Sequence, residues 1–420
     1  MSDTHKVIEA VWRIESTRLI AGIARVTRDV GLAEELAQDA LVTALERWPD
    51  EGIPEKPGAW LMTAAKQRAI DALRRGRMME LKHGEIAREL EFQQQRLGDA
   101  LDEALDQVID DDVLRLIFTA CHPVLAVEGR IALTLRLACG LTTAEIARSF
   151  LVPEKTLGQR IFRAKKTLSD AQVPFETPRG EELKKRVESV LSVVYLIFNE
   201  GYTATAGAEW MRAALCEDAL RLGRMLAQLL PAEPEVHGLL ALMELQASRT
   251  AARREPTGAA VLLSQQDRSL WDHAQIQRGL AALARAQELG GGARSYTLQA
   301  AIAACHARAG TAAETDWNRI VQLYDALLEI SPSPIVALNR AVAVGMAHGP
   351  DAGLQALDAL AAEPALANYH LLPSVRGDLL LKLGRHTEAR EKLQRALAMT
   401  DNVREQELLS KKLEQTIFVG

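Results

Sequence analysis

The sequence contains few aromatic residues, which make up only 4% of its 420 positions. Strands favour aromatic and β-branched side chains, whereas alanine, which recurs throughout this chain, has the highest helix propensity of all residues. This balance disfavours an all-β fold. The apolar content of 48% is ample for buried cores, and the length fits two to three domains of about 150 residues. We therefore expect an all-α protein with more than one domain.

Cysteine is also scarce, with four residues that form no C-x-x-C pair. Neither a disulfide framework nor a thiolate zinc site is therefore indicated. Histidines such as His306 and His370 have no histidine or carboxylate partner four residues away, which disfavours a metal site. No Walker, Rossmann or nucleophile-elbow motif occurs. The sequence thus predicts no cofactor, no metal ion and no enzymatic activity.

Long hydrophobic runs are missing too. No segment approaches the ~20 apolar residues of a membrane span, and the first residues contain no apolar core of a signal peptide. We expect a cytoplasmic protein with no membrane partner. With 50 basic and 56 acidic residues, the net charge is −6, so no chain-wide positive field is available to hold nucleic acid. Any nucleic-acid site must be a local patch.

Basic residues do gather in two segments. Residues 59–77 contain five basic side chains against Asp71 alone, and residues 148–168 contain six against Glu154 alone. Residues 98–112, between them, contain seven acids and no base. A single charged run is usually a solvated helix face. Two positive segments joined by a negative one are unusual and suggest a function.

The first basic segment follows an amphipathic pattern. Apolar residues in 33–48 recur at the spacing of a buried helical stripe, and Glu35, Asp39 and Glu46 lie on the opposite face. Prolines and glycines from Pro49 onward predict a loop. A second helix is expected from Ala59 to near Gly76, with its basic residues toward the C-terminal half.

The second basic segment has the pattern of a helix-turn-helix. Thr142 and Glu145 form a capping box at the start of a short helix, and Pro153 suits the first position of the next helix. In that second helix the apolar residues follow one face, which leaves a basic outward face able to read a major groove. Phe162 on this outward face could contact a thymine methyl group or, alternatively, pack on a partner helix.

Three segments of the sequence resemble parts of one known protein family. AEELAQDALVTALERW (33–48) and PGAWLMTAAKQRAIDALRR (57–75) resemble region 2 of sigma-70-family RNA polymerase sigma factors, and GLTTAEIARSFLVPEKTLGQRIFRAKKTL (140–168) resembles region 4. The short connection leaves no room for a separate sigma-3 domain, as in the extracytoplasmic-function group. Lys66 and Gln67 stand where many relatives have Arg-Asn, which leaves the promoter sequence open.

The resemblance implies roles for particular residues, with core RNA polymerase and promoter DNA as partners. A region 2 domain (1–78) would be followed by an acidic linker (79–112), which runs through the polymerase cleft or is only a solvated connection, and by a region 4 domain (113–170). The minus-ten element would be captured by Lys66, Gln67, Arg68, Arg74 and Arg75. The minus-thirty-five element would be read by Lys155, Thr156, Gln159, Phe162, Arg163 and Lys166. The polymerase clamp would contact Glu34, Glu35, Gln38 and Asp39.

Residues 181–420 are again helical in pattern. Tyr324 and Pro332 are eight residues apart, as in a tetratricopeptide repeat, and small or apolar residues take that repeat's positions further on, at Gly377, Ala389, Leu393 and Ala396. We therefore expect a tetratricopeptide-like helical array that regulates the sigma modules, is required for activity and docks either on the sigma modules within the chain or on polymerase. An alternative is a stand-alone helix-turn-helix regulator with a helical effector domain, but such a regulator has no need for the 33–77 module.

Overall fold

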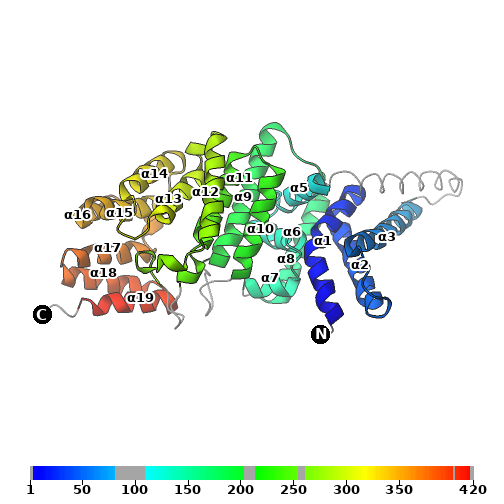
Figure 1. Ribbon diagram of the computed structural model, residues 1–420, viewed down its shortest axis with the longest axis horizontal. Helices are drawn as coiled ribbons and strands as arrows, with labels where there is room; N and C mark the ends of the chain where they lie inside the picture. Colours follow the sequence, from blue (N-terminus) through cyan, green and yellow to red (C-terminus); the bar gives the residue numbers. More distant parts are fainter. Residues whose placement is uncertain are drawn as a thin grey trace. The chain divides into compact units, whose positions relative to one another are not determined.

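Helices form all the regular structure in the described part of the chain. The computed structural model describes residues 3–80, 109–150, 152–202, 213–253, 261–400 and 403–416, and the side chains of 3, 73–80, 109–110 and 403–404 lie outside this description. Within these ranges α-helices and short 3-10 helices occur and strands do not (Figure 1). The prediction of an all-α protein is confirmed. The chain divides into two units, 1–197 and 198–420, which are described separately.

The first unit begins with three helices, α1 (Asp3–Thr27), α2 (Val30–Glu51) and α3 (Pro57–Glu80). Three predicted helix boundaries are wrong. Helix α2 continues through Pro49 to Glu51 and is capped by Gly52, whose φ of 90° is favoured by glycine. Helix α3 begins at Pro57, because the first position of a helix tolerates the missing N–H, and it passes through Gly76.

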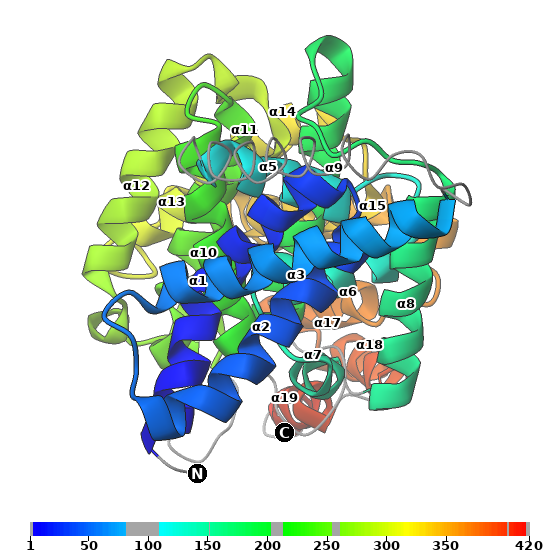
Figure 2. The same ribbon diagram turned by 90° about the vertical axis from the view of Figure 1, so that its right-hand side faces the viewer.

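Helix α1 is buried on every side along its middle. Leu19, Ile20, Ala21, Ile23 and Ala24 are each at most 2% exposed, although consecutive residues point in different directions around a helix. Helix α1 packs against α2 and α3 (Figure 2), and also against two later helices of the same unit, α5 and α6. A helix that is apolar all round lies within a core, so α1 joins the two groups of helices.

The second group consists of α5 (Ile109–Ala120), α6 (Val127–Ala138), α7 (Thr143–Ser149) and α8 (Glu154–Asp170). Helices α7 and α8 form the predicted helix-turn-helix, and Thr142 and Glu145 make both hydrogen bonds of the capping box. Pro153 is the N-cap of α8, one residue before the predicted position. Helix α5 begins before residue 113, so the last residues of the predicted acidic linker are helical.

Helix α9 (Gly180–Tyr202) contains the division between the two units. Its first half covers the end of α5. The Arg186 guanidinium, which is 7% exposed, donates to the backbone oxygen of Phe118 at 2.7 Å. The Ser189 hydroxyl donates to the backbone oxygen of Cys121 at 2.7 Å and accepts from Arg130 at 2.9 Å. Because the last carbonyls of a helix have no partner within it, α9 supplies donors that α5 needs.

The second unit is a succession of helices in which neighbours along the chain pack together. Helix α14 packs on α15, α15 on α16, α17 on α18 and α18 on α19, while α11 contacts both α12 and α13. The bounds of the α-helices are α10 (Ala213–Leu229), α11 (Pro234–Ala247), α12 (His273–Glu288), α13 (Ser295–Arg308), α14 (Trp317–Ile330), α15 (Pro334–His348), α16 (Pro350–Asp358), α17 (Leu371–Lys382), α18 (His386–Ala398) and α19 (Val403–Glu414).

Small residues allow these helices to approach closely. A Cβ atom on Gly377 would lie 2.7 Å from Leu393 Cγ and 3.3 Å from the backbone oxygen of Ala389. Leu393, Ala389 and Ala396 are completely buried. Three of the positions identified from the sequence, Gly377, Ala389 and Leu393, therefore form the contact between α17 and α18. Gly353 plays the same part between α16 and α15, since its Cβ would lie 2.8 Å from the Cα of Gly345.

Candidate nucleic-acid and polymerase interfaces

Helix α8 has an apolar face on one side and a basic face on the other. Leu157, Ile161, Ala164 and Leu168 are each at most 7% exposed, as the spacing predicted. Phe162, on the opposite side, is 68% exposed. The structure brings the six predicted minus-thirty-five residues to this outward side, where Thr156 is half-buried and the others are exposed: Lys155, Thr156, Gln159, Phe162, Arg163 and Lys166.

The helix-turn-helix is held at its start by a charged hydrogen-bond network. The Glu145 carboxylate accepts from the backbone N–H of Thr142 at 2.8 Å, and Arg13 of α1 donates to the same carboxylate at 2.6 Å. Partial burial acts to raise the pKa of Glu145, but these bonds and the Arg13 charge outweigh it, so the pKa lies below its ordinary value. Sequence patterns indicated the cap but not the link to α1.

The predicted minus-ten residues lie on α3, next to α2. Gln67 is exposed, while Lys66 and Arg68 are half-buried. The Arg68 guanidinium donates to the Thr43 hydroxyl at 2.7 Å, and its Nε lies 4.0 Å from Asp39 Oδ2. One residue assigned to DNA and one assigned to the polymerase are thus neighbours. The side chains of Arg74 and Arg75, also predicted here, lie outside the described residues.

The predicted polymerase surface on α2 is divided. Glu35 and Asp39 are exposed and Gln38 is half-buried. Glu34 is only 2% exposed. Its Oε1 accepts from Arg136 Nε at 2.6 Å, and its Oε2 contacts the ammonium group of Lys165. Sequence reasoning placed Glu34 on the exposed acidic surface, but in this structure α6 and α8 cover it.

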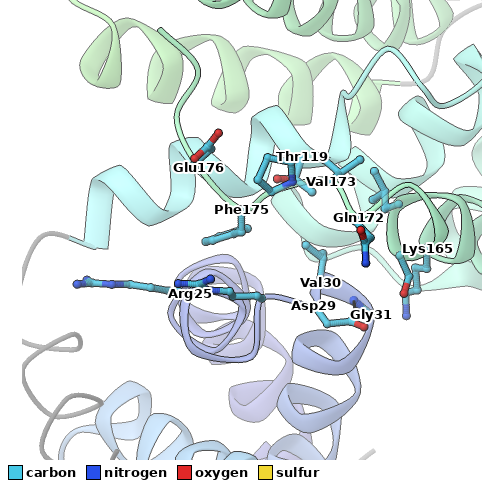
Figure 3. A pocket seen from close by; sticks show the side chains of 14 residues that line it. Arg25, Asp29, Val30, Gly31, Thr119, Lys165, Gln172, Val173, Phe175 and Glu176 are labelled. Carbon is cyan, nitrogen blue, oxygen red and sulfur yellow. Dashed lines mark hydrogen bonds between the residues drawn. The ribbon is translucent and has the colours of Figure 1, made fainter.

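A cleft of about 750 Å³ lies beside this contact. The turn between α1 and α2 forms one wall, and α8 with the segment that follows it forms another (Figure 3). The charged side chains in its lining are Arg25, Arg28, Asp29, Lys165 and Glu176. Lys165, one partner of Glu34, lines this cleft with a side chain that is 19% exposed.

The end of the predicted acidic linker is part of the folded unit. Asp112 is buried in α5, where Arg115 Nη1 lies 2.5 Å and Arg25 Nη1 3.5 Å from its carboxylate. Burial raises the pKa of Asp112, and the two arginines only partly offset this effect. Residues 81–108, which make up most of the predicted linker, lie outside the described residues.

Three segments of the chain match known protein families. Residues 14–78 match Sigma-70 region 2, residues 115–168 match Sigma-70, region 4, and residues 186–287 match a family of unknown function, DUF6596. The chain is 43% identical over 387 residues to "Uncharacterized protein R00370" of Rhizobium meliloti (strain 1021), which covers 92% of this chain and 90% of that protein.

The chain therefore belongs to the sigma-70 family of RNA polymerase sigma factors. Within that family it is an extracytoplasmic-function-like sigma factor with a C-terminal extension, as the resemblance predicted. Its function is in transcription initiation, with core RNA polymerase and promoter DNA as partners, and members of the family are transcription factors, not enzymes. The region 2 match favours this function over a stand-alone regulator. In the described ranges, no helix combines the length and hydropathy that a membrane span needs.

The lowered pKa of Glu145 predicts a pH-dependent contribution to stability. We expect Glu145→Gln to reduce the free energy of unfolding at pH 7 by up to about 1 kcal/mol, because the partly exposed charge pairs with Arg13. A carboxylate with a lowered pKa stabilises the folded chain above its unfolded pKa of about 4.3, and this contribution is lost as the pH falls through the lowered value. Urea unfolding between pH 7 and pH 3.5 measures the difference in free energy of unfolding between the native chain and Glu145→Gln.

The matched control is Glu154→Gln, which removes an exposed carboxylate from the first turn of α8. The difference between Glu145→Gln and the native chain should shrink toward zero at the acid end. A difference that is the same at every pH would show that the charge of Glu145 is not what stabilises the cap.

Proposed function

We propose that this sigma factor reads the minus-thirty-five element through the outward face of α8. The exposed positions of Gln159 and Arg163 beside the buried Leu157 and Ile161 support this assignment. Only the outward face is free of core packing. Arginine pairs with guanine or phosphate and glutamine with adenine, and an exposed phenylalanine offers contact to a thymine methyl group.

Replacing Arg163 by alanine should therefore weaken discrimination between promoter and random DNA by about 1–3 kcal/mol, because one base contact is lost. Fluorescence anisotropy of the full chain with core polymerase measures it on promoters with altered minus-thirty-five elements. Lys184→Ala, which removes an exposed cation from α9, should leave discrimination unchanged. Equal selectivity of Arg163→Ala and the native chain would place the reading face elsewhere.

We further propose that Lys66, Gln67 and Arg68 capture the single strand of the minus-ten element. The position of Gln67 on the surface of α3 supports this role, and Arg68 is oriented by Thr43 and Asp39. Extruding a base costs a few kcal/mol. Stacking and neutralised phosphates offset this cost on single strands.

A triple alanine variant at these three positions should bind core polymerase and promoter DNA. It should fail to melt the promoter near minus ten. Single strands become available only after melting, so closed complexes do not use this contact. Permanganate reactivity of thymines near minus ten measures opening, and pull-down measures polymerase binding. Arg47→Ala, which removes an exposed cation from α2, is the control. Normal promoter melting by the triple variant would show that other residues capture the single strand.

The C-terminal extension, we propose, is a tetratricopeptide-like array on which transcription depends, and it contacts the sigma modules within the chain. The close packing of α17 on α18 at Gly377 supports the likeness to that repeat. Arg186 and Ser189, which bond to the end of α5, lie inside the predicted 181–420 domain, and their position supports contact of residues 181–197 with region 4. These residues belong to the first unit, so the proposed contact of the second unit with the sigma modules rests on the tethering of both within one chain.

Two truncations test this dependence. A chain of residues 1–202 keeps α9, and we expect it to fold and bind core polymerase but to lose run-off transcription. A chain of residues 1–179 also removes Arg186 and Ser189, whose hydrogen bonds to the Phe118 and Cys121 carbonyls each contribute about 0.5–1.5 kcal/mol. Region 4 should then melt at a lower temperature in circular dichroism. Full transcription by 1–202 would show that the array is dispensable.

A further inference from the structure

A second cleft, of about 550 Å³, lies wholly within the second unit. Its lining comes from the short 3-10 helix η2 (Leu263–Gln265), from the segment before α14, and from α13, α14, α15, α17 and α19. These elements are far apart in the sequence, so the cleft exists only in the folded extension. A volume of this size is typical of sites that hold small molecules. The predicted promoter-binding residues all belong to the first unit, so this cleft is separate from them.

Much of the cleft lining is apolar. Its larger apolar side chains come from η2 and the residue before it, α14, α15 and α17: Leu262, Leu263, Trp317, Val342, Met346 and Val375. Met346 is 40% exposed although it is apolar. Methionine adapts its shape to a ligand, and covering exposed apolar surface is favourable in water. The body of a molecule that fits this cleft is therefore apolar.

Charged side chains in the lining are mostly positive. Asp378 of α17 is the single acid among the described residues that line the cleft, against Arg268, Lys382 and Lys412. Three cations and one anion leave a formal charge of +2. Asp378 Oδ1 accepts from Lys412 Nζ at 2.8 Å, and its Oδ2 lies 3.3 Å from Lys382 Nζ. Because an ammonium group carries three N–H donors, each lysine can bind a second acceptor.

The ionisation of these groups is settled at neutral pH. Burial acts to raise the pKa of Asp378, but its two lysines outweigh this effect, so the pKa lies below its ordinary value. Burial, together with the charges of Arg249 and Arg268, lowers the pKa of His306, which also lines the cleft, to about 4. His306 is therefore neutral at pH 7. The excess positive charge comes from the arginine and the lysines.

Arg268 is held in place by the protein. Its guanidinium donates to the backbone oxygen of His306 at 2.6 Å and to the Thr315 hydroxyl at 3.3 Å. It also lies over the ring of Trp271, with 4.8 Å between the guanidinium carbon and the ring centroid. A cation that is already oriented loses little freedom when a ligand binds. Arg268 thus adds a fixed positive charge to the cleft.

We propose that this cleft binds a small molecule that has an apolar body and one acidic group, such as a medium-chain carboxylate. The acidic group lies against the ammonium groups of Lys382 and Lys412, and the apolar body lies against Trp317 and Val342. Charge complementarity selects an acid over a cation of the same shape. Such binding does not depend on the promoter contacts proposed above.

Displacement of a fluorescent dye from the full chain tests this site. The dye is 1-anilinonaphthalene-8-sulfonate, an aromatic molecule with one sulfonate group, whose fluorescence rises in an apolar environment. The native chain should bind the dye, and decanoate should displace it. Decyltrimethylammonium has the same alkyl chain with the opposite charge, so it should not displace the dye.

Charge variants connect binding to the lysines. Lys382→Met keeps an apolar stem of similar length, and Lys412 still pairs with Asp378. This variant should bind decanoate about fivefold more weakly, which corresponds to the loss of one ion pair of a partly exposed lysine. Lys411→Met is the matched control, because it makes the same change at an exposed position of α19 outside the lining. It should leave the affinity unchanged.

A second pair of variants fills the cleft without changing its charge. Ser374 lies half-buried in the lining on α17, so Ser374→Trp should place an indole ring in the cleft and abolish displacement of the dye by decanoate. Ser410→Trp makes the same change at an exposed position of α19 and should leave displacement unchanged. Circular dichroism shows whether both variants fold.

Several results would overturn the proposal. Failure of decanoate to displace the dye, or equal displacement by decyltrimethylammonium, would exclude an acid-binding site. Displacement by the peptide acetyl-trileucine with none by decanoate would assign the cleft to a peptide end instead. Equal affinities of Lys382→Met and Lys411→Met would show that the lysines do not hold the acid, and this pair decides if Ser374→Trp does not fold. Unchanged displacement in a folded Ser374→Trp variant would place the bound molecule elsewhere.

Discussion

The burial of the middle of α1 is the constraint on which the first unit depends. Leu19 and Ile20 point in different directions around the helix, and both, like Ile23, are at most 2% exposed. Burying one such side chain contributes about 1.5–3 kcal/mol, whereas an exposed ion pair contributes about 0–1 kcal/mol. Apolar burial therefore holds the helices of regions 2 and 4 together. The paired charges, which lose energy on leaving water, select the particular arrangement in which they meet.

Local patterns in the sequence predicted the helix-turn-helix well. The capping box at Thr142 and the apolar spacing from Leu157 to Leu168 depend only on near neighbours, and the structure confirms both. Helix ends at Pro49 and Gly76 were less predictable, because packing of a long helix outweighs the preference of one residue. The partners of Glu34 could not be predicted, since Arg136 and Lys165 lie far away in the sequence. The sequence did contain a weak signal that Glu34 is buried, because Glu34 lies one helical turn before the buried Ala37.

The limits of the extension also depend partly on near neighbours in the sequence and partly on residues far away in it. The start at 181 followed from a change in pattern, while the division between the units falls after Ile197. Arg186 belongs to a run of charged residues that suggests a solvated surface. Its guanidinium is buried because the last carbonyls of α5 need a donor, and such a need is visible only once the helices are placed. Residues 81–108 include most acids of the predicted linker, and their role as a linker stays a prediction.

Helix α9 also determines which part of this chain can be inherited or exchanged as a module. Because its residues 180–197 belong with region 4 and only residues 198–202 belong to the other unit, the extension cannot be acquired by adding a gene segment after α8 alone. A recombination point inside the segment 171–179 would separate region 4 from the donors to its own carbonyls. Chimeras between sigma factors with different extensions should therefore carry region 4 and α9 from the same parent.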